Sequence, residues 1–104
     1  MRQKRTQEAL AELAAAAKLA PDDARFAYVY GIALYDTGKR PEALKTLGAA
    51  LARHPYDREI LFALATYERA GGNLAGAREH ARLLRELEPE NRDFGRLAED
   101  AKLG

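Results

Sequence analysis

The sequence predicts an all-α fold built from repeated helix hairpins, and three observations support it. Pro21, Pro55 and Pro89 follow one another at intervals of 34 residues. Gly38 and Gly72, which lie about midway between these prolines, are also 34 residues apart. No segment alternates apolar and polar residues for long enough to indicate a β-strand. A period of this length is typical of repeats that contain two antiparallel helices each.

The signals that end and begin helices recur in phase with this period. A proline cannot continue a helix, and the Asp or Asn that follows it can cap the next one. Glycine just past a helix end accepts the left-handed conformation that closes the helix. Pro41 suits a first helical turn, and Asn73 can cap the corresponding helix of the next unit. We therefore expect six helices, over residues 7–19, 24–37, 41–53, 58–70, 74–88 and 92–102; nothing breaks the chain before residue 7, so the first can begin earlier.

The composition is that of one small globular domain and excludes several classes of function. The 104 residues are 47% hydrophobic and 32% charged, with a formal net charge of +1. Nucleic-acid binders usually carry a basic stripe, so this mixed charge disfavours RNA or DNA as a partner. There is no cysteine, which excludes disulfides and thiolate chemistry.

The apolar segments are too short to span a membrane, and no signal peptide is visible. The basic start of the chain is followed by Glu8 and Glu12, where a signal sequence would be apolar. We expect a soluble protein, cytoplasmic or periplasmic.

The repeat unit resembles the tetratricopeptide repeat, with Ala24 as the first position of a unit. The small residue at position eight is Gly31 and then Ala65, and the alanine at position twenty is Ala43 and then Ala77. Other family positions are also occupied: the alanine at twenty-seven by Ala16 and Ala50, and the closing proline by Pro21, Pro55 and Pro89. The resemblance covers nearly the whole chain and implies hairpins stacked as a short right-handed α-solenoid.

Two departures from the family pattern concern the interior of the second unit. Glu68 stands at position eleven, where the family has an aromatic residue and the first unit has Leu34. Leu47 and Ala50 of the first unit correspond to Ala81 and Leu84 of the second, so the large and the small residue have changed places. An exchange of sizes within one packing layer conserves volume and is tolerable.

The resemblance implies a single domain over residues 1–104. Residues 1–21 form a half repeat, residues 24–57 and 58–91 two full repeats, and residues 92–104 a capping helix. Gly31 and Ala65 are expected at tight contacts with a neighbouring helix.

In the family, the first helix of each hairpin lines a concave groove that binds partner proteins. The family's groove positions correspond here to Arg25, Tyr28, Ile32, Tyr35, Glu59, Phe62, Thr66, Arg69, Asp93 and Arg96. Exposed aromatics beside arginines are typical of protein-binding surfaces. Tyr28 and Phe62 could equally pack between helices, whereas Tyr35 is expected to be the more exposed. This reading makes the chain a protein–protein interaction scaffold.

The chemistry of the groove points to a partner segment with apolar or aromatic side chains. Family members that bind the acidic tails of chaperones use a clamp of lysines, asparagines and an arginine. The corresponding positions here hold Tyr28, Ile32, Ala63, Asp93 and Leu97, and none of them matches.

A second hypothesis is a structural end-module of a larger protein whose repeats mediate self-association or intramolecular packing. Unmatched apolar residues on the first helix, Leu10, Leu13 and Ala17, would favour self-association as a homo-oligomer. A looser resemblance, to repeat modules appended to bacterial multihaem cytochromes, belongs under this hypothesis. Any haem would lie outside this chain, which has no cysteine to attach one.

The sequence gives little support to catalysis, and we expect no enzyme, cofactor or metal site. The two histidines, His54 and His80, are distant in sequence and lie on different predicted helices. The pair Gly71 and Gly72 lacks the lysine of a phosphate-binding loop. Gly76 inside a predicted helix indicates tolerance or close approach of another chain.

Overall fold

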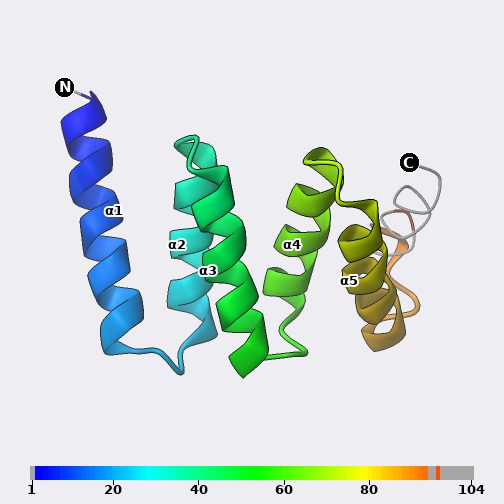
Figure 1. Cartoon of the computed structure of the whole chain (residues 1–104). Coiled ribbons are helices and arrows are strands. Elements are labelled where there is room, and N and C mark those ends of the chain that lie inside the picture. Colours follow the sequence, from blue (N-terminus) through cyan, green and yellow to red (C-terminus); the bar gives the residue numbers. More distant parts are fainter. Residues whose placement is uncertain (1, 94–95, 97–104) are drawn as a thin grey trace. The chain divides into compact units, whose positions relative to one another are not determined.

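The computed structural model describes residues 2–93 and residue 96, and its regular elements are α-helices (Figure 1). The five helices that lie wholly within the described residues are α1 (Arg2–Leu19), α2 (Ala24–Asp36), α3 (Arg40–Arg53), α4 (Arg58–Ala70) and α5 (Leu74–Leu87). Helix α4 has the predicted bounds, and α2, α3 and α5 differ from the prediction by one residue at one end. Helix α1 begins five residues earlier than predicted, since its start carries no proline or glycine. None of these helices has the length and apolar character needed to cross a membrane.

The predicted sixth helix falls mostly outside the described residues. Arg92, Asp93 and Arg96 are helical. The Asn91 side chain accepts a hydrogen bond from the backbone N–H of Asp93, at 3.0 Å. Phe94 and residues 97–102, which carry the expected capping face, are among the residues left undescribed.

Side-chain caps begin three of the helices, as predicted. Asp23 accepts a hydrogen bond from the backbone N–H of Arg25 at 2.9 Å, and Asp57 accepts one from Ile60 at 3.0 Å. Asn73 accepts one from the backbone N–H of Gly76 at 3.1 Å. Each cap satisfies a donor that has no partner within its helix, an interaction typically worth about 1 kcal/mol.

Gly38 and Gly72 make the turns between the helices of the two hairpins. Their φ angles are +88° and +90°, in the left-handed region that side chains other than glycine's disfavour. After Gly38, the backbone N–H of Lys39 donates a hydrogen bond to the carbonyl of Leu34 at 2.9 Å. The equivalent bond after Gly72 joins Asn73 to Glu68 at 2.8 Å. The predicted glycine turns are therefore confirmed.

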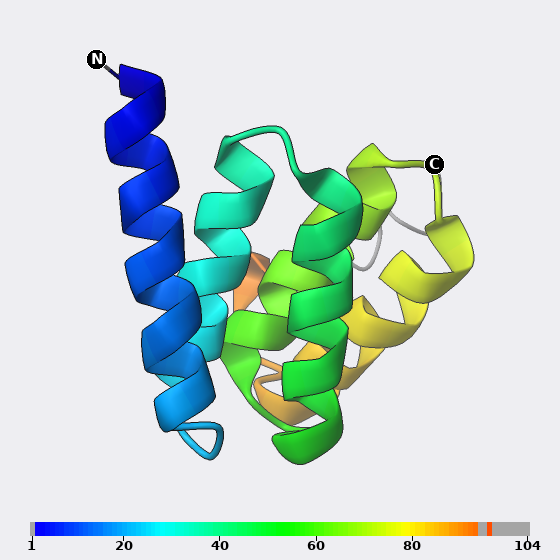
Figure 2. The same cartoon turned by 60° about the vertical axis from the view of Figure 1, so that its left-hand side comes forward.

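The chain divides into two compact units, residues 1–54 and 55–104. In the first unit α2 packs against α3, and α1 lies along α2, as both views show (Figures 1 and 2). Leu10 of α1, Leu34 of α2 and Ala43 of α3 form a buried cluster that joins the three helices. Burial of a leucine side chain stabilises a fold by about 1.5–3 kcal/mol, so this cluster is the main link between α1 and the hairpin.

The second unit is the hairpin of α4 and α5. Helix α4 buries one side from Ile60 to Ala65, and its most deeply buried side chains are Ile60, Leu61 and Ala65, each 0% exposed. Helix α5 contributes three fully buried residues: Ala77, Ala81 and Leu84. An exposed ion pair between Arg58 and Glu88, at 3.0 Å, joins the start of α4 to the end of α5.

Gly31 marks a close approach between the two helices of the first hairpin. A Cβ atom placed on Gly31 would lie 2.6 Å from Cγ and Cδ2 of Leu47, which is itself fully buried. In the second unit the equivalent positions hold Ala65 and Ala81, both 0% exposed. Where the residue of the second helix is a leucine, a Cβ atom on the first helix would crowd it; where that residue is an alanine, a methyl group fits. The exchange of sizes is therefore a compensated change in packing, and Gly31 is as tightly packed as predicted.

We predict that Gly31→Leu lowers the free energy of unfolding by about 1–3 kcal/mol, because the added side chain meets Leu47, which has no space to move into. Denaturant titration followed by circular dichroism measures the change. The matched control is Gly48→Leu on α3, where a Cβ would meet no atom within 4 Å. That substitution should raise stability by up to about 1 kcal/mol, because leucine is the better helix former. Equal effects at both positions would contradict the packing.

Candidate protein-binding surface

The predicted groove residues of the first unit share one side of α2. Arg25, Tyr28, Ile32 and Tyr35 are spaced by three or four residues, which places them on one helix face. Arg25 is exposed, and the other three are half-buried. Gly31 and Leu34, by contrast, are the buried residues of this helix. The α2 face thus offers two tyrosines whose rings are partly covered and partly accessible.

The predicted groove residues of the second unit share one side of α4. Glu59, Thr66 and Arg69 are exposed, and Phe62 lies among them with 40% of its surface exposed. Phe62 is the exposed aromatic of a helix whose other large apolar residues, Ile60, Leu61 and Leu64, are at most 3% exposed. Arg96 is exposed as well. The α2 and α4 faces belong to different units, and their convergence on one groove stays a prediction.

Tyr35 is not the most exposed of the three aromatics, and that expectation was wrong. It is half-buried and packs against the cluster of Leu10, Leu34 and Ala43. The Arg40 guanidinium lies over its ring, 5.3 Å from the ring centroid, in a cation–π contact. Tyr35 sits one residue before the end of α2, close to the start of α3, so both helices hold it in place. Tyr35 thus has packing contacts within the first unit, and Phe62 is the more accessible aromatic.

A half-buried pair, Glu68 and His80, links α4 and α5. Nδ1 of His80 and Oε1 of Glu68 are 2.5 Å apart, and the side chains are 20% and 12% exposed. The Asn73 amide donates to the other Glu68 oxygen at 3.5 Å. In the described residues no third acidic or histidine side chain joins them as a metal-binding group. In the sequence, Glu68 stands out only as a departure from the family pattern. No sequence signal indicates that its side chain contacts His80, which lies twelve residues further along the chain.

The Glu68 carboxylate also accounts for Gly76. A Cβ atom at position 76 would lie 2.5 Å from Oε2 of Glu68 and 2.7 Å from the Asn73 amide nitrogen. Glycine at this position leaves room for the polar cluster between the helices, a packing reason that the sequence did not indicate. The exposed side of α5 carries a separate ion-pair series in which Arg82 binds Glu79 and Glu86, at 2.6 and 2.7 Å. The hydrogen bond from Arg82 holds the pKa of the Glu79 carboxyl below its ordinary value.

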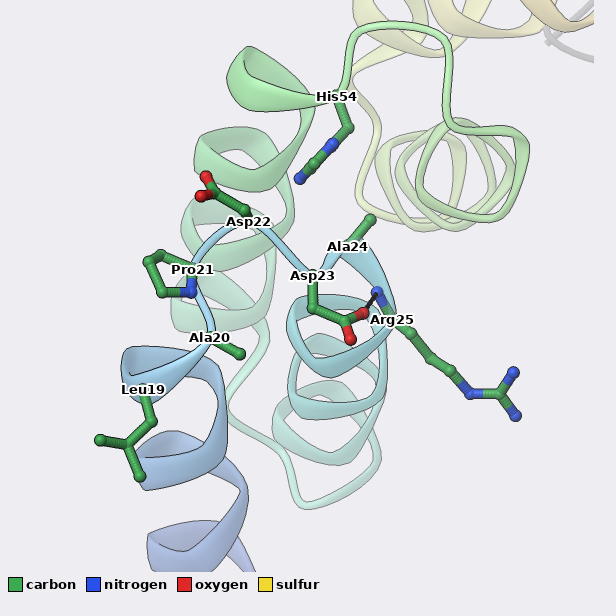
Figure 3. Close-up of a pocket in the computed structure, with 8 residues that line it drawn as sticks. All are labelled: Leu19, Ala20, Pro21, Asp22, Asp23, Ala24, Arg25 and His54. Carbon is green, nitrogen blue, oxygen red and sulfur yellow. Dashed lines mark hydrogen bonds between the residues drawn. The ribbon is translucent and has the colours of Figure 1, made fainter.

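A pocket of the first unit lies at the loop between α1 and α2 (Figure 3). It is lined by residues 19–25 and by His54 from the end of α3. Nε2 of His54 is buried there without a hydrogen-bond partner. The Arg25 side chain extends away from the histidine, as Figure 3 shows. Asp22 binds Arg53 at 3.2 Å instead of the imidazole, so the pocket shows no nucleophile paired with a base.

Comparisons with known proteins identify the family. Two models of the tetratricopeptide repeat match the chain, one over residues 31–92 and the other over residues 1–59. Each match spans more than half of the chain, which therefore belongs to the tetratricopeptide repeat family. Repeats of this family typically mediate protein–protein interactions, and the family is generally non-catalytic. No curated protein matches the sequence.

The fold is similar to that of the type III secretion chaperone SycD of Yersinia enterocolitica, solved in complex with a peptide of the translocator YopD. The TM-score is 0.82, and the match covers 98% of this chain and 83% of that one. Sequence identity is 19%, so the likeness concerns the fold alone.

We predict that Glu68→Ala lowers the free energy of unfolding by about 1–3 kcal/mol, because it leaves the half-buried His80 imidazole without its partner. A double-mutant cycle with His80→Ala, measured by denaturant titration, should give a coupling energy of at least about 0.5 kcal/mol. The same cycle on Glu79 and Arg82, an exposed pair, should give a smaller value. Equal coupling in the two cycles would show that the burial of the Glu68 pair adds nothing.

Proposed function

We propose that this protein is an interaction scaffold that binds a segment of a partner protein through the groove faces of α2 and α4. The observation that carries the proposal is Phe62, a large aromatic 40% exposed on a helix that buries its other large apolar residues. Exposed glutamate, threonine and arginine side chains surround it on the same face. An apolar anchor within a polar rim is the usual organisation of a protein-binding site.

The α2 face supports a partner with apolar or aromatic side chains. Tyr28 and Ile32 are half-buried, so each presents part of a hydrophobic surface that a ligand could cover. Tyrosine combines a large contact area with a polar hydroxyl and loses little conformational entropy when it is bound. Arg25 and Arg69 are exposed at the margins and could pair with acidic residues beside the partner's apolar ones.

Membership of the tetratricopeptide repeat family supports the same proposal, since its repeats typically mediate protein–protein interactions. The structurally similar chaperone SycD was solved with a bound peptide. By this analogy the partner of the present chain would supply a peptide segment, either extended or helical.

We predict that Phe62→Ala weakens binding of such a segment by about 2 kcal/mol or more, which is roughly a thirty-fold increase in Kd. Peptides selected by this chain from a phage-displayed library provide the ligands, and calorimetric titration gives the affinities. Tyr28→Ala should also weaken binding. At position 35 the substitution to test is Tyr35→Phe, because Tyr35→Ala would remove a ring that packs on the core cluster.

The control is Lys45→Ala, at an exposed position of α3. It should leave the affinity unchanged. Selected peptides that lose affinity with Lys45→Ala but not with Phe62→Ala would place the interface on the second helices of the hairpins and refute the groove.

A further inference from the structure

Helix α1 has a neighbour on one side only within the first unit. Helices α2 and α3 form one hairpin and α4 and α5 another, whereas α1 lies along α2 and reaches α3 through the cluster of Leu10, Leu34 and Ala43. In both views no described helix of this unit lies on the other side of α1 (Figures 1 and 2). By its place in the 34-residue period, α1 corresponds to α3 and α5, the second helices of the hairpins. No helix of the described first unit therefore pairs with α1 in the way that α2 pairs with α3.

The unpaired side of α1 carries the same residues that α3 buries. Ala9, Leu13 and Ala16 stand 34 residues before Ala43, Leu47 and Ala50. In α3 these residues are 0%, 0% and 7% exposed. In α1, by contrast, Ala9 is exposed, and Leu13 and Ala16 are half-buried. Because the residues are identical, the difference in exposure comes from the neighbouring helix and not from the sequence.

Helix α2 extends this apolar surface. Phe26 and Val29 are 39% and 38% exposed. They lie on the side of α2 opposite Gly31 and therefore face away from α3. Large apolar side chains exposed together indicate an interaction site. Ala9, Leu13, Ala16, Phe26 and Val29 are called the α1–α2 apolar face below.

Leu10 and Ala17 do not belong to this face. Leu10 is 8% exposed and packs against Leu34 and Ala43, and Ala17 is half-buried. The expectation that Leu10 is unmatched was therefore wrong: α2 covers it. The surface that α2 leaves uncovered is the stripe from Ala9 to Ala16.

The internal repeat specifies what would cover the face. Leu47, the counterpart of Leu13, packs on a glycine of α2 so closely that a Cβ would lie 2.6 Å away. A helix that covers Leu13 in the same way must therefore carry glycine, or at most alanine, opposite it. It must also have apolar residues at spacings of three and four on that side.

We propose that the α1–α2 apolar face binds an amphipathic helix of a partner protein, with glycine or alanine opposite Leu13. Such a helix would complete a hairpin with α1 and continue the α2–α3 interface by one repeat. A second copy of this chain fits less well. Its two helices of the required chemistry, α2 and α4, already bury Gly31 and Ala65 within their own hairpins. This surface is distinct from the groove faces that carry Tyr28 and Phe62.

The test uses a peptide with the sequence of residues 23–38, which contains α2, its cap and Gly31. An i,i+4 staple across positions 25 and 29 keeps it helical and leaves the Gly31 side free, since short isolated helices are marginal in water. Fluorescence anisotropy measures its binding to the full chain. We expect saturable binding, and at least a ten-fold loss when Gly31 of the peptide is changed to Val.

Matched variants of the chain locate the binding site. Ala9→Arg places a long charged side chain on the face and should raise the Kd at least ten-fold. Ala11→Arg alters another exposed alanine of α1, about half a turn away from Ala9, and should leave the Kd unchanged. Circular dichroism of both variants checks that each keeps the helical fold.

Four results of the binding assay would overturn the proposal: no saturable binding, equal losses with Ala9→Arg and Ala11→Arg, equal binding of the Val peptide, or loss of binding with Phe62→Ala. The last would place the peptide in the proposed groove instead. A dimer in sedimentation equilibrium that Ala9→Arg dissociates would make a second copy the occupant and would also refute a partner helix.

Discussion

The close contact between the two helices of a hairpin is the constraint on which the structure depends. Small side chains let the backbones of two helices approach and bury a shared apolar stripe, and Gly31 against Leu47 is such a close contact in the first unit. The second unit satisfies the same constraint with Ala65 and Ala81. Once these stripes are buried, each helix has one orientation, and its remaining faces are fixed as well.

That fixed orientation gives the chain its surfaces. With Gly31 turned toward α3, the side of α2 that carries Tyr28 is left partly accessible, and on α4 the burial of Leu61 and Leu64 leaves Phe62 exposed. The scaffold thus presents aromatic side chains on rigid helices and not on loops, which lowers the entropic cost of binding. Helix α1 carries the same apolar stripe that α3 buries against α2. On α1 the stripe stays partly exposed, because no helix of the described first unit packs against it.

Polar residues inside the second hairpin show how far the family pattern tolerates change. Glu68 replaces the large apolar residue of the first unit, and the structure compensates with His80, the Asn73 amide and the space left by Gly76. A half-buried carboxylate would otherwise be costly. Four residues that look unrelated in the sequence thus form one polar cluster, and Ala65 of the same hairpin stays fully buried.

The sequence by itself determined the helices, their caps and the hairpin turns, because prolines, Asp and Asn caps and glycines act through local backbone geometry. The resemblance to the tetratricopeptide repeat also indicated which positions must be small. Tertiary structure alone decided that Tyr35 is held by Arg40 and the core cluster, that Glu68 meets His80, and that identical Ala and Leu residues are exposed or half-buried on α1 but buried on α3. These outcomes depend on which helix lies alongside, and helical periodicity gives the face of a residue but not the neighbour that covers it.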